Sequence, residues 1–108
     1  MIINYTSISC YMCEHINDYE LSLKNIAGYF QCSPNRIRRI IQRETGKGYK
    51  EYLTQLRMEY AKLLLRNGSR VNDAFQATGY LNRHTFIKAF KRYVGITPSL
   101  YRKNNSGL

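Results

Sequence analysis

Two basic helical segments, each directly after a turn signal, constrain the fold of this chain more than any other feature. The first begins at Ser33-Pro34 and the second begins near Asn82. Serine and asparagine side chains accept hydrogen bonds from the free N–H groups of a first helical turn, and proline fits there because it needs no N–H. A short apolar helix is predicted just before each segment. The chain therefore contains the same unit of helix, turn and basic helix twice.

Glycine and proline divide the whole chain into helix-length segments, and no stretch sustains the alternation of a β-strand. The spacing of apolar residues predicts an all-α fold of seven helices, in which one long helix connects two helix-turn-helix subdomains. We place the subdomains at 1–48 and 68–108, and the connecting helix at 49–67. The predicted helices span about residues 6–18, 23–30, 34–45, 49–67, 71–78, 83–93 and 98–101.

Apolar residues spaced three and four apart give each of the longer helices a face that points into the core. Because the core claims these residues, the charged residues between them are left for the outer faces. The predicted inward residues, in chain order, are Ile8, Met12, Ile16, Ile26, Ala27, Phe30, Ile37, Ile40, Ile41, Tyr52, Leu53, Leu56, Tyr60, Leu64, Leu65, Phe86, Phe90 and Tyr93.

The distribution of charge indicates a polyanionic partner. The 108 residues include 17 lysines and arginines but only 7 acidic residues, which gives a formal net charge of +10. Residues 1–32 hold one base and three acids, a net charge of −2, so residues 33–108 carry +12. Binding to phosphates requires such a concentration of positive charge. Charge alone leaves open a generally basic domain, or one that binds an anionic membrane surface.

The outer faces of the two basic helices carry the donors that reading a DNA duplex requires. In a helix-turn-helix the second helix lies in the major groove, with its early residues toward the base edges. Arginine can bind guanine through O6 and N7, asparagine can pair with adenine, and an apolar side chain can touch a thymine methyl group. The alternative for any single residue is an ordinary solvated helix face, but two such arrays behind two turns favour DNA.

The predicted connecting helix has a length that suits two readers on one duplex. About 19 residues at a rise of 1.5 Å span about 28 Å. Successive major-groove faces of B-DNA lie roughly 34 Å apart. One chain could therefore hold both basic helices against the same side of a duplex, as repressor dimers do with two chains.

The three cysteines are open to two interpretations. Cys10 and Cys13 form a C-x-x-C pair, with His15 close by and Cys32 further along the chain. The pair lies inside a predicted helix, and the second ligand pair of a zinc site is missing. We therefore expect these cysteines to pack as small apolar residues. A metal or redox-sensing site is the alternative.

The sequence gives no support to catalysis or to membrane insertion. Its acidic residues are scattered, neither His15 nor His84 has a suitably spaced carboxylate or nucleophile, and no phosphate-binding glycine loop is present. We therefore predict no enzymatic activity, no catalytic residue, no cofactor and no metal. No segment approaches the roughly 18 apolar residues of a membrane span, and no signal peptide is apparent. We expect a cytoplasmic protein that does not bind membranes.

The run from Gly79 to Arg102 resembles the signature of the AraC/XylS family of bacterial transcription regulators. The signature consists of a glycine and an aromatic residue, then Phe-x-x-x-Phe-Lys, then Gly-x-Thr-Pro-x-x-Tyr-Arg, and this chain has all three parts in order. Residues 52–64 resemble the connecting helix of the family, and Ile26-Ala27 and Ser33-Pro34 match its first helix-turn-helix. The resemblance covers about residues 8–103.

The resemblance implies binding to specific sequences of double-stranded promoter DNA and, in most members, activation of transcription through contact with RNA polymerase. It also implies roles for individual residues, among which Arg57 matches an arginine of the connecting helix that we interpret as structural. The positions expected to read bases are Asn35, Arg38, Arg39, Arg83, His84, Ile87 and Lys88. The positions expected to contact phosphates are Ser33, Arg36, Arg43, Asn82, Thr85, Lys91 and Arg92.

Two features leave the details of this expectation open. The family usually has an aliphatic residue followed by alanine in the helix before the second turn, whereas this chain has Ala74-Phe75. A phenylalanine where two helices meet closely could rotate or loosen the second reader. The chain resembles the small stand-alone members of the family that bind DNA as monomers. A C-terminal fragment of a longer effector-responsive regulator and a non-specific basic binder are the alternatives.

Overall fold

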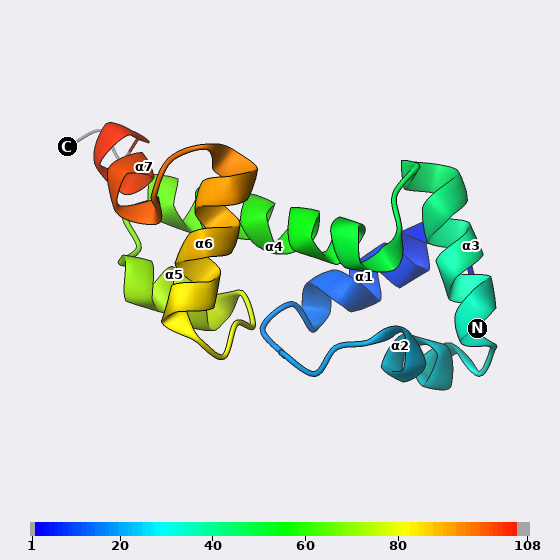
Figure 1. Cartoon of the computed structure of the whole chain (residues 1–108). Coiled ribbons are helices and arrows are strands. Elements are labelled where there is room, and N and C mark those ends of the chain that lie inside the picture. The colour runs from blue at the N-terminus through cyan, green and yellow to red at the C-terminus, as the bar shows by residue number, and fades with distance from the viewer. Residues whose placement is uncertain (1, 106–108) are drawn as a thin grey trace.

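A computed structural model describes residues 2–105, and within this range the chain forms seven helices and no strand, as the sequence predicts. The helices are short except for α4, which runs through the middle of the molecule (Figure 1). Their bounds are α1 (Tyr5–Glu14), α2 (Leu23–Phe30), α3 (Pro34–Thr45), α4 (Tyr49–Arg66), α5 (Val71–Ala77), α6 (Arg83–Val94) and α7 (Pro98–Asn105).

Two helix ends differ from the prediction. The helix expected over 6–18 ends at Glu14, since the backbone of His15 leaves the helical conformation, with φ −111° and ψ 19°. The ring Nδ1 of His15 lies 2.9 Å from the Tyr11 carbonyl oxygen, with which it forms a hydrogen bond. The carboxylate of Asp18 then accepts from the Glu20 backbone N–H at 2.9 Å, which closes a tight turn. The last helix continues to Asn105 rather than stopping near residue 101.

The molecule has two separate apolar cores, one at each end of α4. The N-terminal core packs α1, α2 and α3 against the first half of α4, and the C-terminal core packs α5, α6 and α7 against the second half. The buried residues of the N-terminal core are Ile8, Met12, Ile16, Leu21, Ile26, Ala27, Phe30, Ile37, Ile41, Tyr52 and Leu53. Those of the C-terminal core are Met58, Ala61, Leu65, Ala74, Phe86, Phe90 and Tyr101.

The two cores lie on nearly opposite faces of α4, which corrects the prediction of one inward stripe. At 3.6 residues per turn, the mean directions of the two apolar sets differ by about 170°. The first set is Tyr52, Leu53 and Leu56, and the second is Met58, Ala61 and Leu65. Tyr60 falls back on the side of the first set, beyond the end of the N-terminal core, and is therefore 37% exposed.

The two basic helices lie at opposite ends of an elongated molecule. The principal extents are 45 × 23 × 21 Å, with α3 near one end of α4 and α6 near the other (Figure 1). Across residues 2–105, no helix combines the length and the apolar character needed to cross a membrane.

Candidate nucleic-acid interface

Helix α3 is capped at its N-terminus and exposes its outer face. The hydroxyl of Ser33 accepts a hydrogen bond from the Arg36 backbone N–H at 3.2 Å, and Pro34 occupies the first helical position. Ile37 and Ile41 are fully buried and fix the angle of the helix, whereas Ile40 is only half-buried. All six predicted contact residues of this unit are exposed: Ser33, Asn35, Arg36, Arg38, Arg39 and Arg43.

The exposed residues of α3 divide into two flanks. Asn35 and Arg38 are on one flank, where the Arg38 guanidinium donates to the Asn35 side-chain oxygen at 3.0 Å. Arg36, Arg39 and Arg43 line a hollow of about 440 Å³ against the start of α1 on the other flank. Glu44 lines the same hollow, so the three arginines leave this flank with a net positive charge. The structure thus brings Arg39, a predicted base reader, together with two predicted phosphate contacts.

Helix α6 has the same construction as α3. The side-chain oxygen of Asn82 accepts from the backbone N–H groups of His84 and Thr85 at 2.8 and 3.2 Å. Phe86 and Phe90 are fully buried beneath the helix. Of the predicted contact residues, those that are exposed are Asn82, Arg83, His84, Thr85, Lys88, Lys91 and Arg92.

Two predictions on α6 need correction. Ile87 is half-buried against the C-terminal core rather than freely exposed, because it lies beside the Phe86 and Phe90 stripe. Tyr93, predicted to point inward, is 42% exposed, and its hydroxyl donates to the Glu59 carboxylate of α4 at 3.5 Å. Its hydroxyl therefore stays at the surface, and Phe90 is the last fully buried residue of α6.

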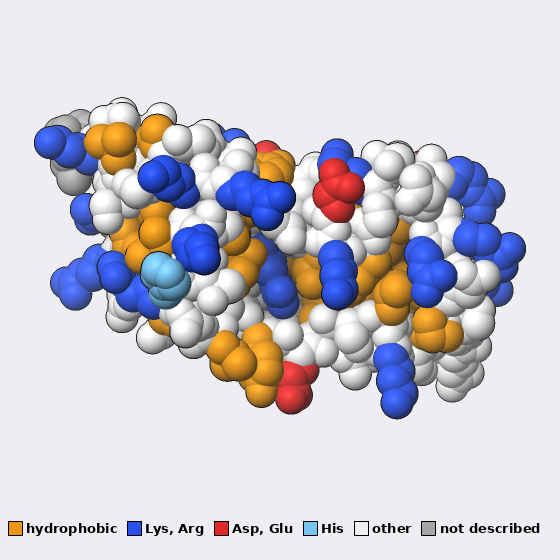
Figure 2. All heavy atoms as spheres, in the orientation of Figure 1, with side chains coloured by type: hydrophobic (Ala, Val, Ile, Leu, Met, Phe, Trp, Pro, Cys, Tyr) orange, Lys and Arg blue, Asp and Glu red, His pale blue; other side chains and the backbone are white. Residues whose placement is uncertain are grey.

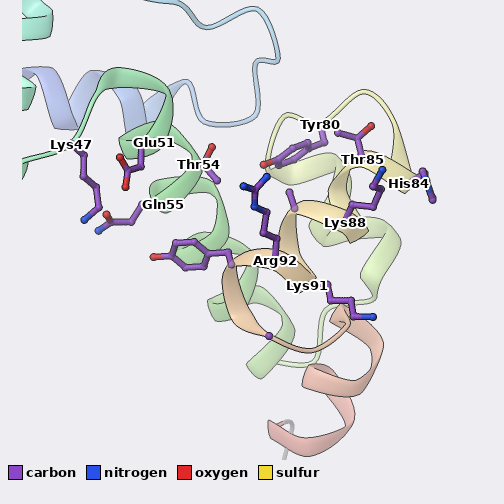
Figure 3. A pocket seen from close by; sticks show the side chains of 13 residues that line it. Lys47, Glu51, Thr54, Gln55, Tyr80, His84, Thr85, Lys88, Lys91 and Arg92 are labelled. Carbon is purple, nitrogen blue, oxygen red and sulfur yellow. The ribbon is translucent and has the colours of Figure 1, made fainter.

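A concave surface of about 1160 Å³ lies between α6 and the start of α4. From α6 it is lined by five of the predicted contact residues, whereas Arg83 and Ile87 lie outside it. The opposite side of the hollow is formed by Lys47, Glu51, Thr54 and Gln55 (Figure 3). The α6 residues in the lining that were predicted to contact DNA are His84, Thr85, Lys88, Lys91 and Arg92.

Lys47 and Gln55 are members of this surface that the sequence did not single out. Lys47 lies in the turn between Gly46 and Gly48, outside any helical pattern. Gln55 lies on α4 outside the predicted inward residues. A basic residue between two glycines, directly after a basic helix, is the one signal that could have indicated the role of this turn.

Positive side chains extend along the length of one face of the molecule. Figure 2 shows lysine and arginine side chains over both ends of this face, with few acidic side chains among them. Within the part of the chain that the structure describes, the one ion pair is Lys62–Glu59, at 3.2 Å. The cations of α3 and α6 are thus not neutralised by ion pairs with described acidic residues and are available to an external anion.

The unusual Ala74-Phe75 pair fits into the second helix-turn-helix in a simple way. Ala74 takes the closely packed position and is fully buried. Phe75 lies at the edge of the C-terminal core, half-exposed, with its ring centroid 6.2 Å from that of Phe86. The larger side chain therefore lies at the edge of the contact between α5 and α6, against Phe86, rather than at its centre.

The cysteines do not pack as expected. Cys10 and Cys13 are both exposed, because Ile8 and Met12 occupy the buried stripe of α1, and Cys32 alone packs partly against the N-terminal core. Although Cys13 is exposed, desolvation of its thiol by the neighbouring protein atoms, followed by the charge of Cys10, raises the pKa of the thiol. Among residues 2–105, no three cysteine, histidine or acidic side chains gather in a way that could hold a metal ion.

Comparisons with known proteins agree with this geometry. The sequence profile of a helix-turn-helix domain family matches residues 26–104. The chain is 33% identical over 95 residues to YtdP of Bacillus subtilis, an uncharacterised HTH-type transcriptional regulator, a match that covers 87% of this chain and 12% of YtdP. The chain also spans only about a third of the length of other curated relatives, or less.

Two solved structures have the same arrangement of helices. The C-terminal domain of AraT, a response regulator from Geobacillus stearothermophilus, superposes with a TM-score of 0.84 at 30% identity, covering 92% of this chain and 83% of that domain. The DNA-binding domain of AdpA, solved with a target DNA, superposes with a TM-score of 0.80 at 21% identity, covering 92% and 89%. The chain is therefore a member of the AraC family of transcription regulators and carries its DNA-binding helix-turn-helix domain.

Proposed function

We propose that this chain binds specific promoter sequences as a monomer, with α3 and α6 in two successive major-groove segments on one side of a duplex. The observation that carries the proposal is the pair of capped, outward-facing basic helices at the two ends of α4. At 1.5 Å per residue the 18 residues of α4 span about 27 Å. The extent of 45 Å along the molecule accommodates the roughly 34 Å between successive major-groove faces.

The outer faces of the two helices would divide the work of recognition. In the first reader, Asn35, Arg38 and Arg39 would contact base edges. In the second reader, His84 and Lys88 are central on the outer face of α6 and would enter the groove most deeply, with Arg83 and Ile87 at the side of the reader nearest the C-terminal core. Because Ile87 is half-buried, only part of its side chain is left to touch a thymine methyl group.

The helix starts and the concave surface would hold the phosphates. Ser33 and Asn82 cap their helices through oxygen atoms, so the serine hydroxyl hydrogen and the asparagine amide group are free to donate to a phosphate. Arg36 and Arg43 on α3 would flank the first groove. The α6 residues proposed for the same role are Thr85, Lys91 and Arg92. To these we add Lys47, which lies across the hollow from them.

The proposal extends to organisation and partners. The first subdomain would comprise residues 1–48 and the second residues 68–108, with 49–67 as the connecting helix. The chain would act in the bacterial cytoplasm as an activator that contacts RNA polymerase, without catalysis. AdpA, whose DNA-binding domain was solved on a target DNA, supports binding through this fold. A place as the DNA-binding part of a longer effector-responsive regulator is compatible with the same role.

The experiment that tests the proposal is selection of bound sequences from a random duplex library at two salt concentrations, with the stoichiometry of the complex measured in parallel. We expect a bipartite motif whose halves are about one helical turn apart, with one chain per site. A motif with a single half would mean that only one helix reads sequence. The absence of an enriched motif at either salt concentration would refute specific recognition and leave a non-specific basic binder.

A further inference from the structure

Arg57 is placed at the point on α4 where the molecule changes from one core to the other. Leu56, on its N-terminal side, packs against the N-terminal core, and Met58, on its C-terminal side, is fully buried in the C-terminal core. The direction of Arg57 around the helix axis falls between the two apolar faces, since consecutive residues differ by about 100°. Its side chain can therefore reach elements of both ends of the molecule.

The contacts of Arg57 do join the two ends. Its guanidinium donates to the Asp18 carbonyl oxygen, in the turn after α1, at 2.8 Å. The same group lies over the ring of Tyr80, in the turn between α5 and α6, at 5.8 Å from the ring centroid. One side chain thus donates to a turn of the N-terminal subdomain, between α1 and α2, and stacks on the turn of the second helix-turn-helix unit.

The backbones of the two ends also meet beside Arg57. Gly79 has φ +79°, and a Cβ built on it would lie 2.6 Å from the Ile16 carbonyl oxygen and 3.0 Å from an Arg57 nitrogen. Such a distance to a backbone oxygen is below van der Waals contact, so only a glycine permits this approach. The turn before α6 therefore rests directly on the turn after α1, away from the axis of α4.

The environment of Arg57 differs from that of the other arginines. Burial lowers the pKa of its guanidinium, and burial likewise raises the pKa of Tyr80. The Nε atom is buried without a hydrogen-bond partner among the described residues. A cation that gives up hydration and leaves one donor unpaired is costly to the fold. A role in holding two parts together accounts for that cost better than a surface role does.

We propose that Arg57, Gly79 and Tyr80 form a junction that fixes the spacing and angle between α3 and α6, and so selects the separation of the two half-sites on DNA. Two bodies joined by a single helix can bend and twist about it, whereas a second contact away from the helix axis removes that freedom. Arg57 is then a positioning residue, not a DNA contact. This inference rests on the proposed function, because it concerns which DNA sites the two readers can occupy together.

The consequence on DNA is a strict preference for one spacing. Each inserted base pair moves the second half-site by about 3.4 Å along the axis and rotates it by about 34°. A rigid molecule then loses the base contacts of one reader, which corresponds to about tenfold or more in affinity. A molecule without the junction can bend to follow the displaced half-site, so it loses much less affinity.

The test uses the full chain and the motif selected by the wild-type protein. Dissociation constants are measured for three duplexes, with the selected spacing, one base pair inserted and one base pair removed. The variants are Arg57→Met, which keeps the apolar stem but loses the junction contacts, and Arg66→Met as the control. Arg66 is exposed in the last turn of the same helix. Both substitutions remove one positive charge, so general attraction to phosphate falls equally.

We expect the wild type and Arg66→Met to prefer the selected spacing by about tenfold or more. In Arg57→Met the preference for the selected spacing should fall to about threefold or less, because the variant can bend and keep most of its base contacts on the other two duplexes. A purely structural loss would lower the folded fraction and weaken binding to all three duplexes by one factor, leaving the ratio unchanged. An unchanged ratio in Arg57→Met, or a wild-type ratio near one, overturns the inference.

A second variant and one further comparison cover the cases in which Arg57→Met does not fold or the wild type selects no bipartite motif. If thermal unfolding shows that Arg57→Met does not fold, Tyr80→Leu removes the ring under the guanidinium while leaving an apolar side chain against Phe86, and its spacing ratio decides in the same way. If the wild-type protein selects no bipartite motif, the proposed function itself fails and the junction has no sites to select between. That result differs from a bipartite motif whose spacing preference survives Arg57→Met.

Discussion

Replacing Gly79 by alanine should destabilise the protein more than the same change at Gly46. Both glycines have left-handed backbone angles, with φ +79° and +72°, so alanine is strained at each by about 1–2 kcal/mol. Alanine also reduces the entropy of the unfolded chain, which returns about 0.4–1 kcal/mol in both variants. These two effects leave a net loss of about 1 kcal/mol at Gly46, where a Cβ would have nothing within 4 Å.

At Gly79 a third effect is added. The new Cβ would lie 2.6 Å from the Ile16 carbonyl oxygen and 3.1 Å from the Asn17 carbonyl carbon, and backbone atoms cannot turn aside as a side chain does. Relieving such an overlap by backbone shifts typically costs about 1–3 kcal/mol. We therefore expect Gly79→Ala to lose about 2–4 kcal/mol of unfolding free energy, against about 1 kcal/mol for Gly46→Ala.

Urea denaturation followed by circular dichroism measures both losses under the same conditions. Because the control shares the backbone strain and the entropy gain, the difference between the two variants isolates the close approach of the two turns. Equal losses would refute the reasoning, since they would mean that the turn after α1 yields freely to the new methyl group. A smaller loss at Gly79 than at Gly46 would do so more strongly.

Three other predictions concern recognition and pH. Arg39→Ala should relax the base preference at one position of the first half-site, at a cost of about 1–3 kcal/mol in binding free energy. Repeating the selection with this variant measures the change. An equal loss of affinity on every sequence would instead assign Arg39 to the phosphates with Arg36 and Arg43. Lys91→Ala should weaken binding to all duplexes alike and lower the salt slope by about one, and a loss confined to the selected motif would contradict a phosphate role. The third prediction concerns Tyr49, whose hydroxyl donates to the Leu21 carbonyl oxygen at 3.1 Å and whose pKa burial raises to about 12 from 10. The unfolded state loses this proton first, so the stability contributed by Tyr49 is complete below about pH 10 and is lost as the pH rises toward about 12. Urea midpoints measured from pH 9 to 12 should therefore fall less steeply in Tyr49→Phe than in the wild type. Identical slopes would show that ionisation of Tyr49 does not contribute to the loss of stability at high pH.

The features that the sequence predicted well are those set by local chemistry. Ser33-Pro34 and Asn82 cap the helices at the predicted residues, because capping depends on a side chain and the N–H groups two or three residues beyond it. The stripes of Ile37 with Ile41 and Phe86 with Phe90 are buried for a similarly local reason. A period of 3.6 residues in a short helix leaves one face for the core.

The features that it missed depend on parts of the chain that are distant in sequence. Helix α4 serves two cores on nearly opposite faces, so its average pattern suggested one broad stripe that included Tyr60 and omitted Met58 and Ala61. The bridge from Arg57 to Asp18 crosses 39 positions of the chain. The concave surface containing Lys47 likewise exists only once α6 has packed against α4.

Because the two cores are separate, each half of the chain can tolerate substitutions independently of the other. No buried residue belongs to both cores, so a substitution away from the junction at Arg57 and Gly79 leaves the packing of the other core intact, and the effects of changes at Ile41 and Phe90 on stability should add. Each half can then exchange its outer residues, and repack beneath them, without a matching change in the other. Related proteins can therefore change the DNA sequence read by one half while the other half keeps its target sequence and its stability.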